Sequence, residues 1–125
     1  MTRGVNRISM FGFKLKRKHF QRIISYTRNL EMLYLEDCII ETLGVKFLDI
    51  NYKLVQISLE NCGIRKYSDW VNNPEGFLSL LTAIEKSSLK DSLNTISLKE
   101  SNFIDEDIID RCRNFGIELE LPFQN

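Results

Sequence analysis

The sequence predicts an α/β fold, a solenoid with a short parallel sheet on its concave face and helices on its convex face. Three observations support this prediction. An eleven-residue phrase returns along the chain, most copies are spaced by about 24 residues, and the hydrophobic period changes between copies from that of a strand to that of a helix. We therefore expect residues 1–125 to form one domain of about five repeats.

The repeated phrase follows the pattern apolar-x-x-apolar-x-apolar-x-x-(Cys/Ser/Phe)-x-apolar. It reads VNRISMFGFKL from Val5, LEMLYLEDCII from Leu30, LVQISLENCGI from Leu54 and LNTISLKESNF from Leu93. The starts are 25, 24 and 39 residues apart, and a degenerate copy, GIELEL, follows 23 residues later at Gly116. The long interval predicts an insertion near 65–78, where we expect Trp70 to cover core that a longer helix exposes.

Each phrase is expected to form a short strand followed by a turn. Leu33 and Leu35 lie two residues apart, so they point to the same side of an extended chain while Tyr34 points to the other. The ninth position, held by Cys38 in the second copy, lies at the turn, where Cys or Asn can reach backbone groups that the strand leaves unpaired. One unit cannot bury its own apolar side, so neighbouring units must stack into a parallel sheet.

Between the phrases the apolar residues follow the period of a helix, as at Phe20 and Ile24. Helices are expected over 16–28, 41–50, 74–87 and 105–115. Asn73 before Pro74 is a good start signal, because Asn caps a helix and Pro is tolerated in its first turn. Gly116 is expected to end the last helix, since glycine is favoured just after a helix C-terminus.

The phrase resembles the leucine-rich repeat, L-x-x-L-x-L-x-x-N/C-x-L, over residues 5–121. Cys38 and Cys62 at the ninth position, with a period in the mid-twenties, resemble the cysteine-containing, helix-bearing repeats of ribonuclease-inhibitor-like proteins and F-box substrate receptors. The resemblance implies binding through the concave sheet, and the F-box subclass implies recognition of substrates for ubiquitin ligation. The same fold carries many unrelated functions, so the partner is not implied.

The composition indicates a folded intracellular protein. At 125 residues and 43% hydrophobic, the chain can bury one core, and no apolar stretch approaches the roughly 20 residues of a membrane span. Three widely spaced cysteines favour reduced thiols over a secreted disulfide framework. We expect a cytoplasmic or nuclear location. The arginine-rich, acid-free N-terminus also fits a mitochondrial transit peptide, although its removal would delete the first strand and helix.

The sequence carries no motif for catalysis, metal binding or cofactor binding. The sole histidine, His19, has no signature that links it to a cysteine nucleophile. Cys38 and Cys62 lie one repeat apart, but a structural zinc site needs four ligands with closely paired cysteines. The glycines form no phosphate-binding motif. We therefore expect a non-enzymatic protein without a metal or cofactor.

The outward strand positions are expected to form columns across the concave face. The residues expected to bind a partner there are Arg7, Phe11, Met32, Tyr34, Glu36, Asp37, Gln56, Ser58, Glu60 and Lys99. Apolar anchors among carboxylates suit a protein partner with a basic surface, because the anchors supply binding energy and the charges steer association. We thus predict an adaptor or scaffold subunit of a larger complex. The other interpretation is that the carboxylates form only a solvated face.

The first thirty residues carry eight cations and no acid, whereas the rest of the chain carries nine cations and all 17 acids. The cations that could contact nucleic-acid phosphates are Lys14, Lys16, Arg17, Lys18 and Arg22. Binding of nucleic acid or ribonucleoprotein is therefore the alternative function. Against it, Phe13, Leu15, Phe20 and Ile23 are expected in the core of the first repeat, which makes the cations its ordinary outer face.

The ends of the array carry no developed polar cap. Only residues 1–4 precede the first expected strand, and residues 122–125 follow the last. A solenoid needs its open core and its edge strands covered. We therefore expect another subunit of a hetero-complex to cover one end.

Overall fold

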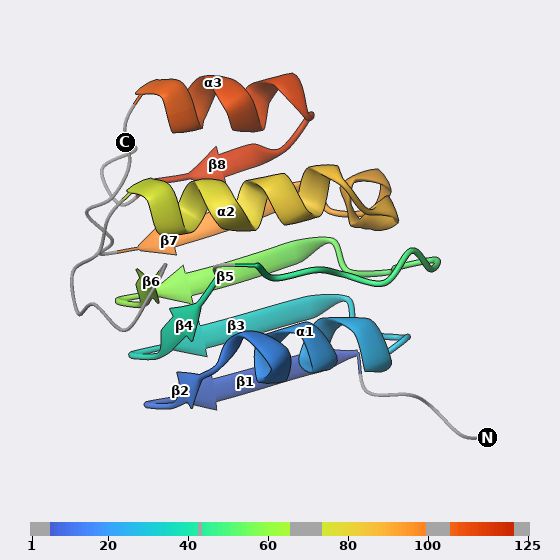
Figure 1. The fold of residues 1–125 in the computed structure, drawn as a ribbon, viewed down its shortest axis with the longest axis vertical. Helices are drawn as coiled ribbons and strands as arrows, with labels where there is room; N and C mark the ends of the chain where they lie inside the picture. The colour runs from blue at the N-terminus through green and yellow to red at the C-terminus, as the bar shows by residue number, and fades with distance from the viewer. Residues whose placement is uncertain (1–5, 43, 66–73, 100–105, 122–125) are drawn as a thin grey trace.

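The computed structural model describes residues 6–42, 44–65, 74–99 and 106–121. Within these ranges the strands form two parallel sheets (Figure 1). The larger sheet has the order β1 (Arg7–Phe11), β3 (Met32–Glu36), β5 (Gln56–Glu60), β7 (Thr95–Lys99) and β8 (Glu118–Glu120). The smaller sheet has the order β2 (Lys14–Leu15), β4 (Ile39–Glu41) and β6 (Gly63–Arg65). The predicted α/β fold with a parallel sheet is confirmed.

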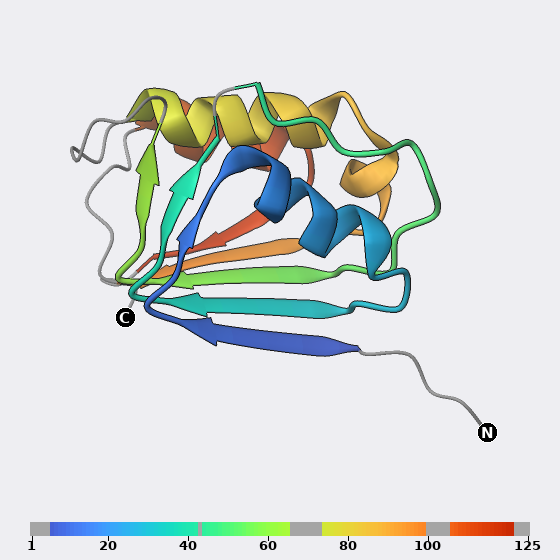
Figure 2. The same ribbon diagram turned by 60° about the horizontal axis from the view of Figure 1, so that its bottom comes forward.

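The described helices lie on one face of the larger sheet (Figure 2). They are α1 (Arg17–Tyr26), α2 (Pro74–Glu85), the 3-10 helix η1 (Ser88–Asp91) and α3 (Glu106–Asn114). Figure 2 also shows β2, β4 and β6 rising from one end of the larger sheet toward the helices. Phe20, Phe77 and Ile108, one from each α-helix, are fully buried in the core. In the described part of the chain, no helix is long and apolar enough to cross a membrane.

The repeated phrase determines how the strands pair. Leu33 of β3 pairs with Ile57 of β5, Leu35 pairs with Leu59, and all four residues have 0% of their surface exposed. The intervening residues point to the opposite face, because side chains alternate along a strand. The predicted columns are confirmed: Arg7, Met32, Gln56, Thr95 and Glu118; Ser9, Tyr34, Ser58, Ser97 and Glu120; and Phe11, Glu36, Glu60 and Lys99.

The chain turns from the larger sheet into the smaller one at the same place in three copies. Gly12, Asp37 and Asn61 hold these corners with φ of 74°, 54° and 50°. This left-handed backbone is open to glycine and is tolerated by Asp and Asn, whose short polar side chains bond locally. The corners therefore stack as a column of equivalent turns.

The buried cysteines lie directly after these corners. The Cys38 thiol donates to the carbonyl oxygens of Glu36, 3.3 Å away, and Met10, 3.6 Å away. The Cys62 thiol donates to the carbonyl oxygen of Leu35, 3.2 Å away in the preceding copy. The ninth position reaches backbone groups at the turn as predicted, although the Glu36 carbonyl oxygen is not left unpaired, since it also accepts from the Gly12 amide over 3.0 Å.

Three predicted helices are present, those expected over 16–28, 74–87 and 105–115. Gly116 ends α3 with a φ of 73°, and the Ile117 amide donates to the Cys112 carbonyl oxygen over 2.9 Å. This left-handed glycine closes the last turn as predicted.

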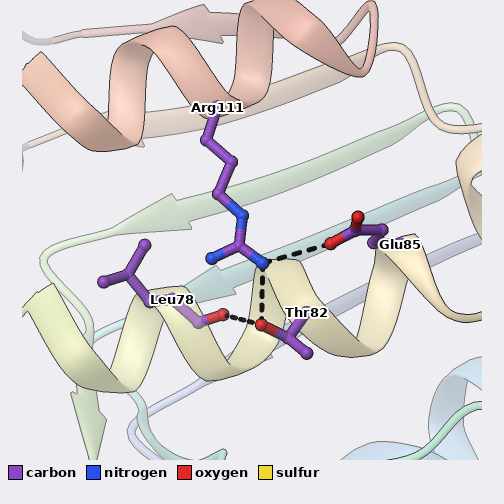
Figure 3. Close-up of polar contacts among 4 residues, drawn as sticks. All are labelled: Leu78, Thr82, Glu85 and Arg111. Carbon is purple, nitrogen blue, oxygen red and sulfur yellow. Dashed lines mark hydrogen bonds and ion pairs between the residues drawn. The ribbon is translucent and has the colours of Figure 1, made fainter.

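Arg111 of α3 ties this helix to α2 (Figure 3). Its Nη2 donates to Thr82 Oγ1 over 2.8 Å and to the Glu85 carboxylate over 3.1 Å. The Thr82 hydroxyl in turn donates to the Leu78 carbonyl oxygen over 2.9 Å. The guanidinium also lies 6.0 Å from the centre of the Phe115 ring. One side chain thus connects the outer surfaces of two neighbouring helices.

The helix predicted over 41–50 is wrong. In the described residues of this segment, Val45 and Phe47 are buried while Lys46 between them is exposed, which is the two-residue period of extended chain. The Lys46 amide donates to the side-chain oxygen of Gln21 in α1 over 2.7 Å. The Lys46 amide is therefore satisfied by a side chain of α1, whereas in a helix over 41–50 it would have donated to a carbonyl oxygen of the same helix.

The expected burial of Phe13 is also wrong, since 52% of its surface is exposed. Leu15 and Phe20 are buried as predicted, and Ile23 is half-buried against the core. In the strand register Phe13 stands where the second copy has Cys38. A phenyl ring is much larger than the thiol at that position, so it does not fit the same buried space.

Some predictions fall outside the described residues. These include the places of Trp70 and Asn73 and the two ends at residues 1–4 and 122–125, where no developed cap is expected. The described part of the predicted insertion includes the start of α2 at Pro74.

Candidate functional site

The larger sheet has a face turned away from the helices, here called the open sheet face (Figure 2). It carries the three columns of outward side chains from β1, β3, β5, β7 and β8. Because the strands are parallel and in register, side chains far apart in sequence become neighbours along each column. The predicted partner-binding residues of these strands are therefore brought together on one surface.

Two aromatic rings lie together on the open sheet face. The centres of the Phe11 and Tyr34 rings are 6.0 Å apart, and the ring planes are inclined by 58°. Such a tilted arrangement is favourable for aromatic pairs. Phe11 keeps 58% of its surface exposed, and Tyr34 is half-buried. The pair therefore offers exposed apolar surface that a partner could cover.

Tyr34 is held in place by the neighbouring strand. Its hydroxyl donates a short hydrogen bond to the carboxylate of Glu60 on β5. This bond, with burial and the charge of Glu36, raises the pKa of Tyr34 to about 12. The phenol therefore stays protonated at neutral pH, and its ring is oriented before any partner arrives.

Carboxylates surround the aromatic pair. Glu36 pairs with Phe11 in the strand register and with Glu60 on its other side. Just beyond the strand ends, the Asn61 side-chain amide donates to Asp37 over 2.7 Å. Asp37 and Asn61 are both exposed and both belong to the column of corners. Glu36, Asp37 and Glu60 therefore lie close together at the ends of β3 and β5.

The remaining predicted contacts differ in accessibility. Ser58 points to the open sheet face between Tyr34 and Ser97 but has only 5% of its surface exposed. It therefore offers little surface to a partner, and its predicted contact with one stays a prediction. Arg7 is exposed, and Met32 and Gln56 beside it are half-buried. Lys99 lies opposite Glu60 in the register.

The basic residues of the N-terminal repeat lie on the other side of the molecule. Those predicted as phosphate contacts are exposed on β2, on α1 and between them: Lys14, Lys16, Arg17, Lys18 and Arg22. Lys46 joins them from the segment that crosses beside α1. Lys46 is not among the predicted cations, and the helix expected over 41–50 does not bring it beside α1 as the extended segment does. The alternation of apolar Val45, charged Lys46 and apolar Phe47 was the available signal.

The thiols and the histidine form no recognisable reactive group. Burial raises the pKa of the Cys62 thiol to about 12 and that of the Cys112 thiol to about 11. Both thiols are therefore protonated at neutral pH, and a protonated thiol is a poor nucleophile. His19 is exposed on α1. The described residues contain no group of three or more His, Cys, Asp or Glu side chains that could hold a metal ion.

No protein-family model, curated protein or solved structure matches the chain. What the open sheet face can bind is therefore inferred from the chemistry of its own residues.

Proposed function

We propose that the chain is a leucine-rich-repeat solenoid that acts as a non-enzymatic adaptor or scaffold subunit of an intracellular complex. In this proposal the open sheet face binds a basic segment of a protein partner. The observation that carries it is the aromatic pair of Phe11 and Tyr34 beside the carboxylates of Glu36, Asp37 and Glu60.

The stacking of equivalent parts supports the repeat assignment. The phrases starting at Leu30 and Leu54 place Cys38 and Cys62 one period apart, and both thiols bind backbone oxygens of the preceding copy. Repeats of this kind contact mainly their neighbours, so an additional copy can be inserted between two others. A chain in which residues 30–53 are duplicated in tandem should therefore fold and unfold cooperatively. Loss of cooperative unfolding in the duplicated chain would contradict the repeat assignment.

The chemistry of the open sheet face supports a basic partner. Exposed aromatic side chains can anchor an interface, and surrounding carboxylates attract cations and reject acidic competitors. Arginine suits this mixture best, because its planar guanidinium can stack on the Phe11 or Tyr34 ring while it donates hydrogen bonds to carboxylates. Tyr34 is already oriented by Glu60, which lowers the entropy lost when a partner binds.

The first test measures binding of labelled peptides to the full chain by fluorescence anisotropy. An arginine-rich peptide with an aromatic residue should bind, a lysine peptide of equal charge should bind more weakly, and an acidic peptide should not bind. The variant Tyr34→Ala, Glu36→Lys, Glu60→Lys should lose at least tenfold in affinity, since it removes an anchor and reverses two charges.

A matched control carries the same kinds of change on the helical side. Tyr26→Ala, Glu106→Lys and Asp107→Lys alter one exposed aromatic residue and two exposed acids away from the sheet. This control should bind the arginine peptide within about twofold of the wild type. Equal loss in both variants would mean that net charge alone drives binding, and the open sheet face would not be the site. If only the triple variant loses affinity, affinity purification with nuclease added should identify a natural partner that the wild type and the control retain and the triple variant loses.

A further inference from the structure

A groove lies between α1 and the connecting segment 44–48. It consists of two adjoining hollows of about 230 and 290 Å³. Lys18, Gln21 and Lys46 line both of them, so the two hollows form one continuous groove along the helix.

The walls of this groove are held together by hydrogen bonds to backbone groups. The Lys46 amide donates to Gln21 Oε1 over 2.7 Å, and the Leu48 amide donates to Ser25 Oγ over 3.3 Å. Both acceptors are side chains of α1. These two bonds hold segment 44–48 beside α1.

The charge of the groove is entirely positive. Arg17, Lys18 and Arg22 line it from α1, and Lys46 lines it from the opposite wall. No acidic residue is among the lining residues of either hollow. Between described residues, none of these four cations forms an ion pair. Four cations that converge from two walls, without an internal counter-charge, form a site for an anion with several charges.

Two exposed side chains add apolar surface to the groove beside the cations. Tyr26 lines one hollow with 69% of its surface exposed, and Leu48 across from it is 47% exposed. Tyr26 is on α1, one helical turn beyond Arg22. An aromatic ring at the end of a row of cations is the combination that single-stranded nucleic-acid sites use, since the cations follow the phosphates and the ring stacks on a base.

The dimensions of the groove narrow the choice of ligand. The two hollows adjoin along α1, which suits an extended ligand better than one compact enclosed molecule. Lys18 and Arg22 lie one helical turn apart, about 6 Å along the axis, which suits anionic groups that recur along a chain. An acidic peptide would satisfy the cations but would leave the Tyr26 ring without a planar partner.

We infer that the groove between α1 and segment 44–48 binds the phosphate backbone of a single-stranded nucleic acid, with Tyr26 stacked on a base. This activity is separate from the protein binding proposed for the open sheet face. Figure 2 shows α1 on the side of the larger sheet opposite the open sheet face, and α1 forms one wall of the groove, so both ligands can be held at once.

The test is fluorescence anisotropy of the full chain with a labelled twelve-nucleotide oligouridine and with a duplex of the same length. Four phosphate contacts predict that affinity falls about fiftyfold between 50 and 200 mM salt. Lys18→Glu with Lys46→Glu should weaken binding at least tenfold and roughly halve the salt dependence. Tyr26→Ala should weaken binding about tenfold and leave the salt dependence unchanged, and Tyr26→Phe should retain affinity because its ring still stacks.

A matched control replaces two lysines outside the groove. Lys53 and Lys86 are exposed, and Lys53→Glu with Lys86→Glu changes the net charge by the same amount. This control should bind oligouridine within about threefold of the wild type. All variants alter exposed side chains, and circular dichroism checks that each is folded.

Three results would overturn the inference. Oligouridine could fail to bind at 50 mM salt, or the groove variant and the lysine control could lose affinity equally. A duplex, polyglutamate or anionic vesicles of phosphatidylserine could also bind more tightly than oligouridine, which would assign the groove to another kind of polyanion. The inference is supported if salt-dependent binding of oligouridine is lost in Lys18→Glu with Lys46→Glu and kept in Lys53→Glu with Lys86→Glu.

Discussion

Tyr34 on β3 donates its hydroxyl hydrogen to the carboxylate of Glu60 on β5, so two copies of the repeated phrase are joined across the open sheet face. The two residues are diagonal neighbours, because Tyr34 pairs with Ser58 and Glu60 pairs with Glu36. Diagonal pairs on one face of a sheet are within reach of an aromatic side chain. The pairing of β3 with β5 therefore orients an aromatic side chain of the proposed binding surface.

Replacing Glu60 should change the titration of Tyr34. The Glu60 hydrogen bond is the first cause of the rise in the pKa of Tyr34 from 10.0 to about 12. In Glu60→Gln this pKa should fall toward 10, because the amide accepts a weaker hydrogen bond and does not repel the phenolate. The measurement is tyrosinate absorbance, taken as the difference between each chain and the same chain carrying Tyr34→Phe. A wild-type Tyr34 that titrates near 10 would show that the contact does not persist in solution.

Stability should fall in alkaline solution. The pKa of the Cys62 thiol is raised from 9.0 to about 12, and that of Cys112 from 9.0 to about 11, mainly by burial. The folded state therefore holds these protons more tightly than the unfolded state. Their contribution to stability is complete below about pH 9 and is lost as the pH rises through 11 and 12. Urea unfolding between pH 7.5 and 10.5 should show a declining free energy of unfolding above pH 9, with a smaller decline in Cys62→Ala, Cys112→Ala.

The thiols should be inert while the chain is folded. Cys38, Cys62 and Cys112 are free and buried. At pH 7.5 a disulfide reagent such as Ellman's reagent should modify them only as fast as the protein opens, and all three should react at once in denaturant. Rapid modification of one thiol under native conditions would place that residue in a segment that opens locally.

Arg111 should contribute more to stability than its neighbour Arg113. Arg111 bonds Thr82 and Glu85 across two helices, whereas Arg113 forms an exposed pair with Asp110 on its own helix. Because its ion pair is partly exposed, Arg111→Ala should lower the free energy of unfolding by about 1 kcal/mol, and Arg113→Ala by less than about 0.5 kcal/mol. Denaturant unfolding of both variants gives the comparison. Equal effects would contradict a role for Arg111 in joining α2 to α3.

Gly76 should tolerate no side chain. A Cβ at this position would lie 2.8 Å from the Ile64 carbonyl oxygen, where α2 approaches β6. Gly76→Ala should therefore cost about 2–3 kcal/mol, since a backbone atom must move. Gly12→Ala meets no atom within 4 Å but keeps a φ of 74°, so its cost should be about 1–2 kcal/mol from the left-handed backbone alone. Denaturant unfolding that ranks the two variants in the opposite order would contradict this account of the contact.

The strand register could be predicted from the sequence because each phrase marks its own inward residues. Leu33 and Leu35 in one copy and Ile57 and Leu59 in the next must all face the core, and a shift by one residue would expose every one of them. The cysteine after the corner, as at Cys38, was predictable for a similar reason, because the short strand leaves backbone groups within reach of a small donor.

The segment 41–50 could not be predicted in the same way. Val45 and Phe47 are apolar in either a helix or an extended chain, and the deciding partner, Gln21, belongs to a different element. The predicted cations also leave out Lys46, which this crossing places beside α1. Likewise, the exposure of Phe13 follows from the size of the buried space that Cys38 fills in the next copy.

The sequence by itself determined the period of the array, the inward and outward sides of each strand and the separation of charge between the N-terminal repeat and the rest of the chain. These properties depend on side-chain alternation and on composition, which are local. Only the tertiary structure decided that Tyr34 bonds Glu60, that Ser58 is covered and that Lys46 faces α1. Each of these depends on the distance between elements and on the volume of the side chains around them, and such quantities arise only when separate parts of the chain pack together.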